Sequence, residues 1–390
     1  MKRLLLPLLL LLTVPVFSQD NSLELLGARD TRTLALGGVF EAMSEGYRCF
    51  LGNPAAYSVN SEALTIPFAS LQLYSPLAQN DFFQVLDLVQ RFLGVRPAGT
   101  MDPLDLPTLA EPYASLISGN GLGAGLSFGF GWIGEGLAFG LSAEADGYLQ
   151  GVEPLLATGR IDVQVAAVVG FVVPIPIAGL DLSFGGNVRP FWRLAMPYTG
   201  ADLFGLTMTA TTPDPLASAG FGLAADLGLR LELFDDLAFG LSVRDITTDQ
   251  LYKSASLDAI LGGFGTGIAA GVDVVYHVLP ELNVGLSLRP IPQFLWTWLE
   301  LLVVVEAQDV LGVLTAGQSA LAMLHAGVEL GVLNNTLTAQ FGFSGGAWSF
   351  GLGLDFLALE GNLAFFAEPV NSLPGSLIRT GFSLDFAIRF

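Results

Sequence analysis

Apolar residues alternate with small or polar residues along much of this chain. Between Leu122 and Trp132, every second side chain is apolar, and the positions between them are glycine or serine. The stretch 221–232 alternates in the same way, with Asp226 and Arg230 on its second face. Successive side chains of a β-strand point to opposite faces, so both stretches predict strands with one apolar and one small or charged face.

The alternation recurs from residue 62 onward. It predicts about fifteen strands, centred on 62–74, 122–132, 137–144, 160–173, 180–194, 221–232, 237–248, 266–278, 282–290, 299–308, 320–331, 337–344, 348–356, 362–369 and 376–390. Bacterial barrels made from one chain have an even number of strands, so one assignment is expected to be wrong and we predict fourteen. The assignments in doubt are 62–74, which contains Pro67, and the pair 282–290 and 299–308, which flank Pro290 and Pro292.

Composition favours a membrane barrel over a soluble sandwich. Hydrophobic residues make up 52% of the chain, yet the longest apolar stretch after the N-terminus, 165–180, is interrupted by glycine and proline. Lipid-facing strands of about ten residues give such a composition. A charge facing lipid at the bilayer centre costs roughly 2–4 kcal/mol, so the charged faces should line the lumen. Single strands do not exclude a sandwich, in which the charges would face water, but the whole pattern predicts an all-β, transmembrane antiparallel β-barrel.

Both ends of the sequence agree with an exported barrel. Lys2 and Arg3 precede an apolar run that is short for a spanning helix, which predicts a signal peptide over 1–18; the alternative is a retained anchor. The stretch 376–390 alternates and ends on Phe390. It resembles the closing strand of bacterial outer-membrane barrels, which is their assembly signal. The resemblance implies that role for Phe386, Ile388 and Phe390, and the outer-membrane barrel assembly machinery as a partner.

Charge limits the partners and defines the predicted lumen. The chain has 16 Lys and Arg against 36 Asp and Glu, which argues against nucleic acid as a partner. The predicted polar lumen residues are Asp226, Arg230, Arg244, His325 and Glu329, and the inner wall is also expected to carry Asp162, Asp181, Arg189, Asp273, Arg289 and Asp355. Unpaired charges are costly in a narrow lumen, so Arg230 and Arg244 should form ion pairs with Asp226 and Glu232 and also contact the N-terminal segment.

The connections between strands fall into two classes. Short turns at 133–135, 234–236 and 333–335 should lie on the periplasmic side. Longer connections at 75–120, 195–218 and 249–264 are candidates for extracellular loops. Apolar residues approach helical spacing in 81–93, and the other two connections contain the segments 203–208 and 257–261. A short helix over the barrel mouth would collect hydrophobic ligand, with Phe82, Phe83, Leu86 and Phe92 as the capturing residues; the alternative is a locally packed loop.

The segment before the first strand carries a family resemblance. It contains the small-residue run Leu34–Ala42 and then Gly52-Asn53-Pro54-Ala55-Ala56. These residues look like the hatch of the FadL family, whose members share a "LGG…A" segment followed by Asn-Pro-Ala before the first strand. Glycines permit tight turns in a lumen, and Asn-Pro initiates a turn. The resemblance implies a hatch over 19–60 and a barrel over 61–390, with Gly37, Gly38, Asn53, Pro54 and Ala55 closing the lumen.

The C-terminal third resembles a related branch. The segments Leu324–Leu330 and Ala347–Gly353 are similar to the "hxGxE" and "xGxG" strands of PorV, PorQ and an allied spirochaete-type group. The fatty-acid transporters have a longer hatch and more basic residues near the ligand, and this departure leaves the ligand open.

The sequence has few residues suited to catalysis. It contains two histidines, His277 and His325, and neither an HExxH motif, a Cys/His metal spacing nor a GxxxxGK[ST] loop. We therefore predict no enzyme, no metal and no cofactor. The lone Cys49 allows no internal disulfide.

Two functions remain. The first is a hatch-gated outer-membrane channel for small hydrophobic molecules such as fatty-acid-like ligands. The second is a non-transporting barrel that scaffolds a secretion or surface-attachment system, as the PorV resemblance implies. A continuous apolar path from the loop helices to the hatch would favour the channel.

Overall fold

The computed structural model describes residues 30–43, 46–50, 52–59, 63–74, 117–153, 156–177, 180–200, 216–233, 236–246, 250–263, 271–276, 280–369 and 378–390. The strands are β1 (Ala63–Tyr74), β2 (Leu122–Gly134), β3 (Leu137–Gln150), β4 (Thr158–Ile177), β5 (Leu180–Thr199), β6 (Leu216–Leu233), β7 (Leu237–Ile246), β8 (Gln250–Ser256), β9 (Val272–Tyr276), β10 (Glu281–Leu288), β11 (Leu299–Ala307), β12 (Leu324–Val332), β13 (Leu337–Ser344), β14 (Ala347–Phe356), β15 (Leu359–Pro369) and β16 (Ile378–Arg389). The labelled helical elements are α2 (Thr31–Ala35), η2 (Gly46–Phe50), η3 (Pro54–Val59), α6 (Leu257–Gly262), η5 (Gln293–Leu295), α7 (Val310–Thr315) and η6 (Ala320–Met323).

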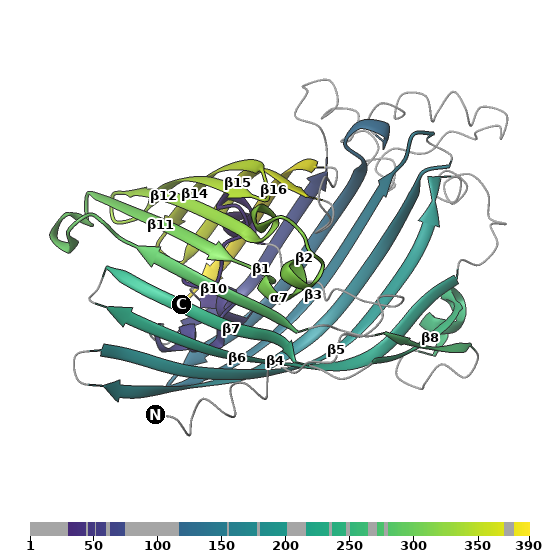
Figure 1. The fold of residues 1–390 in the computed structure, drawn as a ribbon, viewed down its shortest axis with the longest axis horizontal. Coiled ribbons are helices and arrows are strands. Elements are labelled where there is room, and N and C mark those ends of the chain that lie inside the picture. Colours follow the sequence, from purple (N-terminus) through teal and green to yellow (C-terminus); the bar gives the residue numbers. More distant parts are fainter. Residues whose placement is uncertain are drawn as a thin grey trace.

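Fourteen of the sixteen described strands close into an antiparallel barrel (Figure 1). The order around the ring is β5-β4-β3-β2-β1-β16-β15-β14-β13-β12-β11-β10-β7-β6, and β6 pairs with β5 to close it. The first and last strands are neighbours, and the backbones of Leu64 and Phe390 exchange two hydrogen bonds of 2.8 Å. The predicted fourteen-stranded barrel is confirmed.

The prediction failed at 266–278, which was not one of the stretches in doubt. There, β9 pairs with β8, and β8 pairs with Leu216–Ala219 at the beginning of β6, so this hairpin lies beside the ring. Asp273 on β9 pairs with Lys253 and is 57% exposed, so its predicted place on the inner wall is wrong. By contrast β1 joins the ring, because a register shift between Thr65 and Phe68 accommodates the proline between them.

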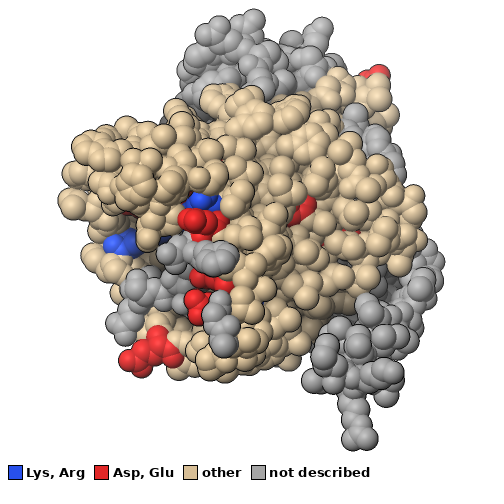
Figure 2. Space-filling model, turned by 60° about the vertical axis from the view of Figure 1, so that its left-hand side comes forward, with Lys and Arg blue, Asp and Glu red and all other residues tan. Residues whose placement is uncertain are grey.

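The strands of the ring have an exposed apolar face and a buried face that carries the polar and charged residues, together with glycine and some apolar side chains such as Val168 and Leu302. On β16, Leu384 and Phe386 are 57% and 43% exposed, whereas Ser383 and Asp385 are 1% and 3% exposed. The visible wall in Figure 2 carries few charged side chains. A soluble sandwich would bury the apolar faces, so this pattern rules it out and matches a wall that faces lipid. Among the described residues, no helix is long and apolar enough to cross a bilayer.

The two rims of the barrel differ. On the rim next to Phe390 short turns at 135–136, 333–336 and 357–358 join strands, and the longer connection 289–298 with η5 joins β10 to β11; we call this the turn side. Leu333, Asn334 and Asn335 all have positive φ angles, and asparagine tolerates this conformation well. The opposite rim, the loop side, carries the longer connections with α6 and α7. α6 confirms the helix expected at 257–261.

The outer face predicts how the barrel tolerates charge. Leu352 on β14 is 63% exposed, and Thr338 lies on the inner face of the neighbouring β13. Leu352→Lys should lower the yield of folded barrel in vesicles, because a lysine facing lipid near the bilayer centre costs about 2–4 kcal/mol. Thr338→Lys, the matched inward control, should fold nearly as well as wild type. Heat-modifiable migration on gels measures this, and equal yields would contradict the assignment of the faces.

Candidate functional site: a plug inside the barrel

The described residues between 30 and 57 lie inside the ring, and we call them the plug (Figure 1). The plug contacts the inner face of every strand of the ring. Each of the fourteen strands supplies at least one contact residue. Taken in chain order from β1 to β16, and leaving out β8 and β9, these residues are Phe68, Gly129, Gly140, Gly170, Gly185, Gly228, Ser242, Ser287, Glu306, Glu329, Gly342, Gly351, Glu360 and Asp385. A segment with partners all around the ring fills its cross-section.

Towards β1–β4 the plug is apolar. Tyr47 stacks on Phe68 of β1 at a ring distance of 5.0 Å, and Phe50 and Tyr57 pack beside it. These side chains lie where Cβ atoms would stand at three inner-face glycines, Gly129, Gly131 and Gly170, and Phe50 packs tightly against a fourth, Gly140. We call the strip formed by these glycines the glycine trough. Side chains there would displace the rings, so glycine is what lets aromatic residues sit against the wall.

Towards β12–β16 the plug is held by charge. The Arg32 guanidinium donates two hydrogen bonds of 2.7 Å to the carboxylate of Glu329. Arg48 lies 2.6 Å from Asp30 within the plug and 2.6 Å from Glu360 of β15. Paired in this way, buried charges are tolerated, whereas removal of one partner is strongly destabilising.

A single carboxylate of β11 holds the irregular middle of the plug. Glu306 accepts backbone hydrogen bonds from Phe40, Glu41 and Ala42 at 2.9, 2.6 and 3.2 Å. Gln308, just beyond β11, donates to the carbonyl of Gly38 at 2.7 Å. The plug backbone here forms no strand or helix ladder, so the wall supplies the partners that a ladder would supply.

All five predicted hatch residues lie in the plug. Gly37 and Gly38 have φ angles of +76° and +84°, and a Cβ on Gly37 would overlap the Phe343 backbone. The Asn53 amide donates to Glu41 at 2.7 Å and to the Leu229 carbonyl at 2.9 Å, and its oxygen accepts from the Ala55 amide at 2.9 Å. Pro54 and Ala55 pack against Gly185. Their role as a gate stays a prediction.

The predicted polar lumen residues lie on the inner wall, and four of the five contact the plug. Arg230 donates to the Ala42 carbonyl at 2.8 Å and pairs with Glu232 at 2.7 Å, as expected. The Arg244 guanidinium lies 5.1 Å from the centre of the Phe40 ring. His325 Nδ1 is 2.7 Å from the Gly37 carbonyl oxygen. Asp226 differs from the prediction, because it pairs with Arg189 of β5 at 3.1 Å.

The remaining predicted residues have different outcomes. The loop residues Phe82, Phe83, Leu86 and Phe92, and also His277, lie outside the described residues. Phe386 and Phe390 are exposed on the outer face, and Ile388 is half-buried; their assembly role stays a prediction. Sequence reasoning missed the anchors Asp30, Arg32, Arg48, Glu306 and Glu360. Two arginines within a small-residue segment were the available signal for partners in the wall.

The described part of the chain offers no evident catalytic or metal centre. No group of three His, Cys, Asp or Glu residues there is placed to hold a metal ion. Two Gly-x-Ser-x-Gly sequences occur, at 125–129 and 342–346, but the first lies within β2 and the second at the hairpin between β13 and β14. A nucleophile elbow needs a strand-to-helix turn instead.

Glu41 is a buried carboxylate of the plug. It accepts hydrogen bonds from Ser242 Oγ and the Asn53 amide, both at 2.7 Å, and it is fully buried. Burial and, second, the nearby charge of Glu306 raise the pKa of Glu41 to about 8. The docked plug therefore favours protonated Glu41.

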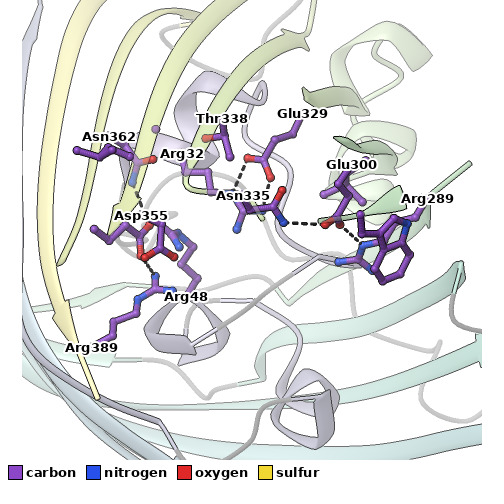
Figure 3. A pocket seen from close by; sticks show the side chains of 15 residues that line it. Arg32, Arg48, Arg289, Glu300, Glu329, Asn335, Thr338, Asp355, Asn362 and Arg389 are labelled. Atoms are coloured by element: carbon purple, nitrogen blue, oxygen red, sulfur yellow. Dashed lines mark hydrogen bonds and ion pairs between the residues drawn. The ribbon is translucent and has the colours of Figure 1, made fainter. Parts of the chain in front are cut away.

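Two cavities lie on opposite sides of the plug. The turn-side cavity, about 300 Å³, is lined by Arg32, Arg289, Glu300, Glu329 and Asp355 among others (Figure 3). The loop-side cavity, about 320 Å³, is lined by residues at the other rim, including Asp245, Glu281, Gln308, Ser344 and Glu368. Of the described residues, Arg48 lines both.

Comparisons place this barrel beside known structures. The sequence matches no protein-family model and no curated protein sequence. The P. putida toluene transporter TodX has a TM-score of 0.47 at 13% identity, covering 93% of this chain and 97% of its own. The Ralstonia pickettii toluene transporter TbuX has a TM-score of 0.48 at 13% identity, and the match covers 92% of this chain and 97% of TbuX. A Pseudomonas aeruginosa FadL homologue has a TM-score of 0.44 at 10% identity, and the match covers 93% of this chain and 98% of the homologue. It comes from the family that the hatch motifs resemble. This likeness says nothing of the ligand.

The contact of Gly37 with β13 predicts a mutational effect. Gly37→Ala should loosen the plug by about 1–3 kcal/mol, because the added methyl overlaps the Phe343 backbone. Hydrogen exchange of the amides between 34 and 42 should then speed up by about tenfold. Gly317→Ala is the matched control, since Gly317 has a φ of +65° but open space around it. Equal exchange of the plug amides in the two variants would refute the contact.

Glu41 predicts a pH dependence of plug docking. Its pKa is about 8 in the docked plug and near 4.5 when free. The docked state therefore binds the proton more tightly, and docking should weaken as pH rises from 4.5 to 8. Glu41→Gln should weaken this dependence, and the part that remains comes from the second buried carboxylate beside it, Glu306. The test is the hydrogen-exchange protection of the plug amides as a function of pH, corrected for the intrinsic exchange rate at each pH. If protection changes with pH in the same way in wild type and Glu41→Gln, Glu41 is excluded as the cause.

Proposed function

We propose that this protein is an outer-membrane channel for small hydrophobic molecules and that the plug closes it. The wall has an apolar exterior suited to lipid and a lumen occupied by a segment of the same chain. In this proposal residues 1–18 are the export signal, and the plug belongs to a hatch that ends just before β1. The barrel assembly machinery would insert the strands.

The observation that carries the proposal is the apolar side of the lumen. Tyr47, Phe50 and Tyr57 are 2–3% exposed, and they pack with Phe68 and Val172 into one cluster against β1–β4. An apolar solute that took the place of these rings would meet a surface of similar chemistry. Burying such rings stabilises by an amount that scales with apolar area, so a hydrophobic solute can compensate for their displacement.

The attachment of the plug is compatible with movement. Its aromatic contacts are non-directional, and its ion pairs to the wall lie on other strands, β12 and β15. The plug could therefore leave the glycine trough while its charged side stays attached. Such tilting would open an apolar path beside β1–β4 while the Arg32–Glu329 ion pair stays intact.

The proposal predicts solute selectivity. In vesicles with an outer leaflet of lipopolysaccharide, which hydrophobic solutes cross slowly, the full chain should speed the entry of a small hydrophobic dye but not of glucose. Phe50→Ala should raise dye entry several-fold, because it empties part of the trough. Phe350→Ala is the matched control, since Phe350 is 53% exposed on the outer face of β14.

Two results would oppose the proposal. Dye entry no faster than in protein-free vesicles would favour the scaffold function instead. Equal dye entry for Phe50→Ala and Phe350→Ala would remove the glycine trough as the route.

A further inference from the structure

The two cavities meet at one side chain. Arg48 lines both, is 4% exposed, and binds Asp30 and Glu360 at 2.6 Å each. Asp30 lines the loop-side cavity and Glu360 the turn-side cavity. The chain of ion pairs Asp30–Arg48–Glu360 thus crosses the plug from one cavity to the other.

The side chains around the Asp30–Arg48–Glu360 ion pairs are polar. Arg389 also pairs with Glu360, at 2.5 Å. The Asn362 amide donates to Glu360 at 3.0 Å and to Asp385 at 2.8 Å. Figure 3 shows Arg48, Asn362 and Arg389 pointing towards the same part of the turn-side cavity. A route lined by these groups suits water and ions, and it differs from the apolar trough at β1–β4.

The charge around Arg48 sets which ions such a route would take. Four carboxylates lie in the network, on Asp30, Glu329, Glu360 and Asp385, and the plug backbone at Thr31 donates to Asp385 at 2.8 Å. Arg32 and Arg389 compensate two of them. Without the Arg48 guanidinium the passage would carry excess negative charge, which attracts cations and repels anions.

We propose that the barrel contains a second, polar route for small cations and that the Arg48 guanidinium alone seals it. The seal is both steric and electrostatic, because the side chain fills the constriction and its charge opposes cation entry. The inference rests on the membrane barrel of the proposed function but concerns a different wall and a different class of solute.

Single-channel recording in planar bilayers with potassium chloride tests this. Wild type should show low conductance, and Arg48→Ala should raise it several-fold with a reversal potential that indicates cation preference. Arg48→Met keeps the packing of the stem without the charge and should also leak cations. Arg48→Lys should stay closer to wild type. Arg289→Ala is the matched control. Arg289 lines the turn-side cavity and pairs with Glu300 at 2.8 Å, but it is not part of the Asp30–Arg48–Glu360 ion pairs.

The outcomes separate the two proposals. Arg48→Ala or Arg48→Met barrels that insert and pass hydrophobic dye, yet conduct no more than wild type, would overturn the polar route alone. An equal rise in Arg289→Ala would overturn it as well. Failure of wild type itself to insert into a bilayer would overturn the proposed function and the polar route together.

Discussion

The need to satisfy buried backbone groups governs the interior of this barrel. Residues 36–43 of the plug run through the lumen without a regular ladder, and an unpaired buried amide or carbonyl costs about 1–3 kcal/mol. Glu306, Gln308 and Arg230 meet that need from the wall. The polar faces of the strands are therefore more than a consequence of facing away from lipid. They are the partners that let an irregular segment stay inside.

The plug divides the lumen into two kinds of surface. Glycines of β2–β4 bring aromatic rings against the backbone, and arginines of the plug reach carboxylates of β12 and β15. Apolar contacts are non-directional and adjust to displacement, whereas ion pairs hold defined positions. In the functions proposed above, this division would let hydrophobic solutes pass along one wall while the other wall stays closed to ions.

The strands were predictable because period-two alternation is a local signal, and lipid requires it of every lipid-facing strand. Alternation does not encode which strand is the neighbour, so the stretch 266–278, which contains β9, is predicted in the ring, and β8 lies within the predicted loop 249–264. The hatch was implied only by the resemblance of the segments around Gly37, Gly38 and Asn53-Pro54 to the FadL family. Its anchors were not predicted, because Arg32 and Glu329 are 297 residues apart and neither lies in a recognisable motif. Long-range pairing of this kind needs the fold before it becomes visible.

The central claim, a plug seated in the barrel, has a native reporter. Cys49 is the single cysteine of the chain, lies in the plug and is fully buried. The direct measurement is the rate at which a membrane-impermeant thiol reagent modifies Cys49 in the folded, vesicle-inserted wild type, compared with the unfolded chain. A seated plug predicts modification that is slower by orders of magnitude in the folded protein. Modification at the unfolded rate would show that the plug lies outside the lumen and would contradict the account.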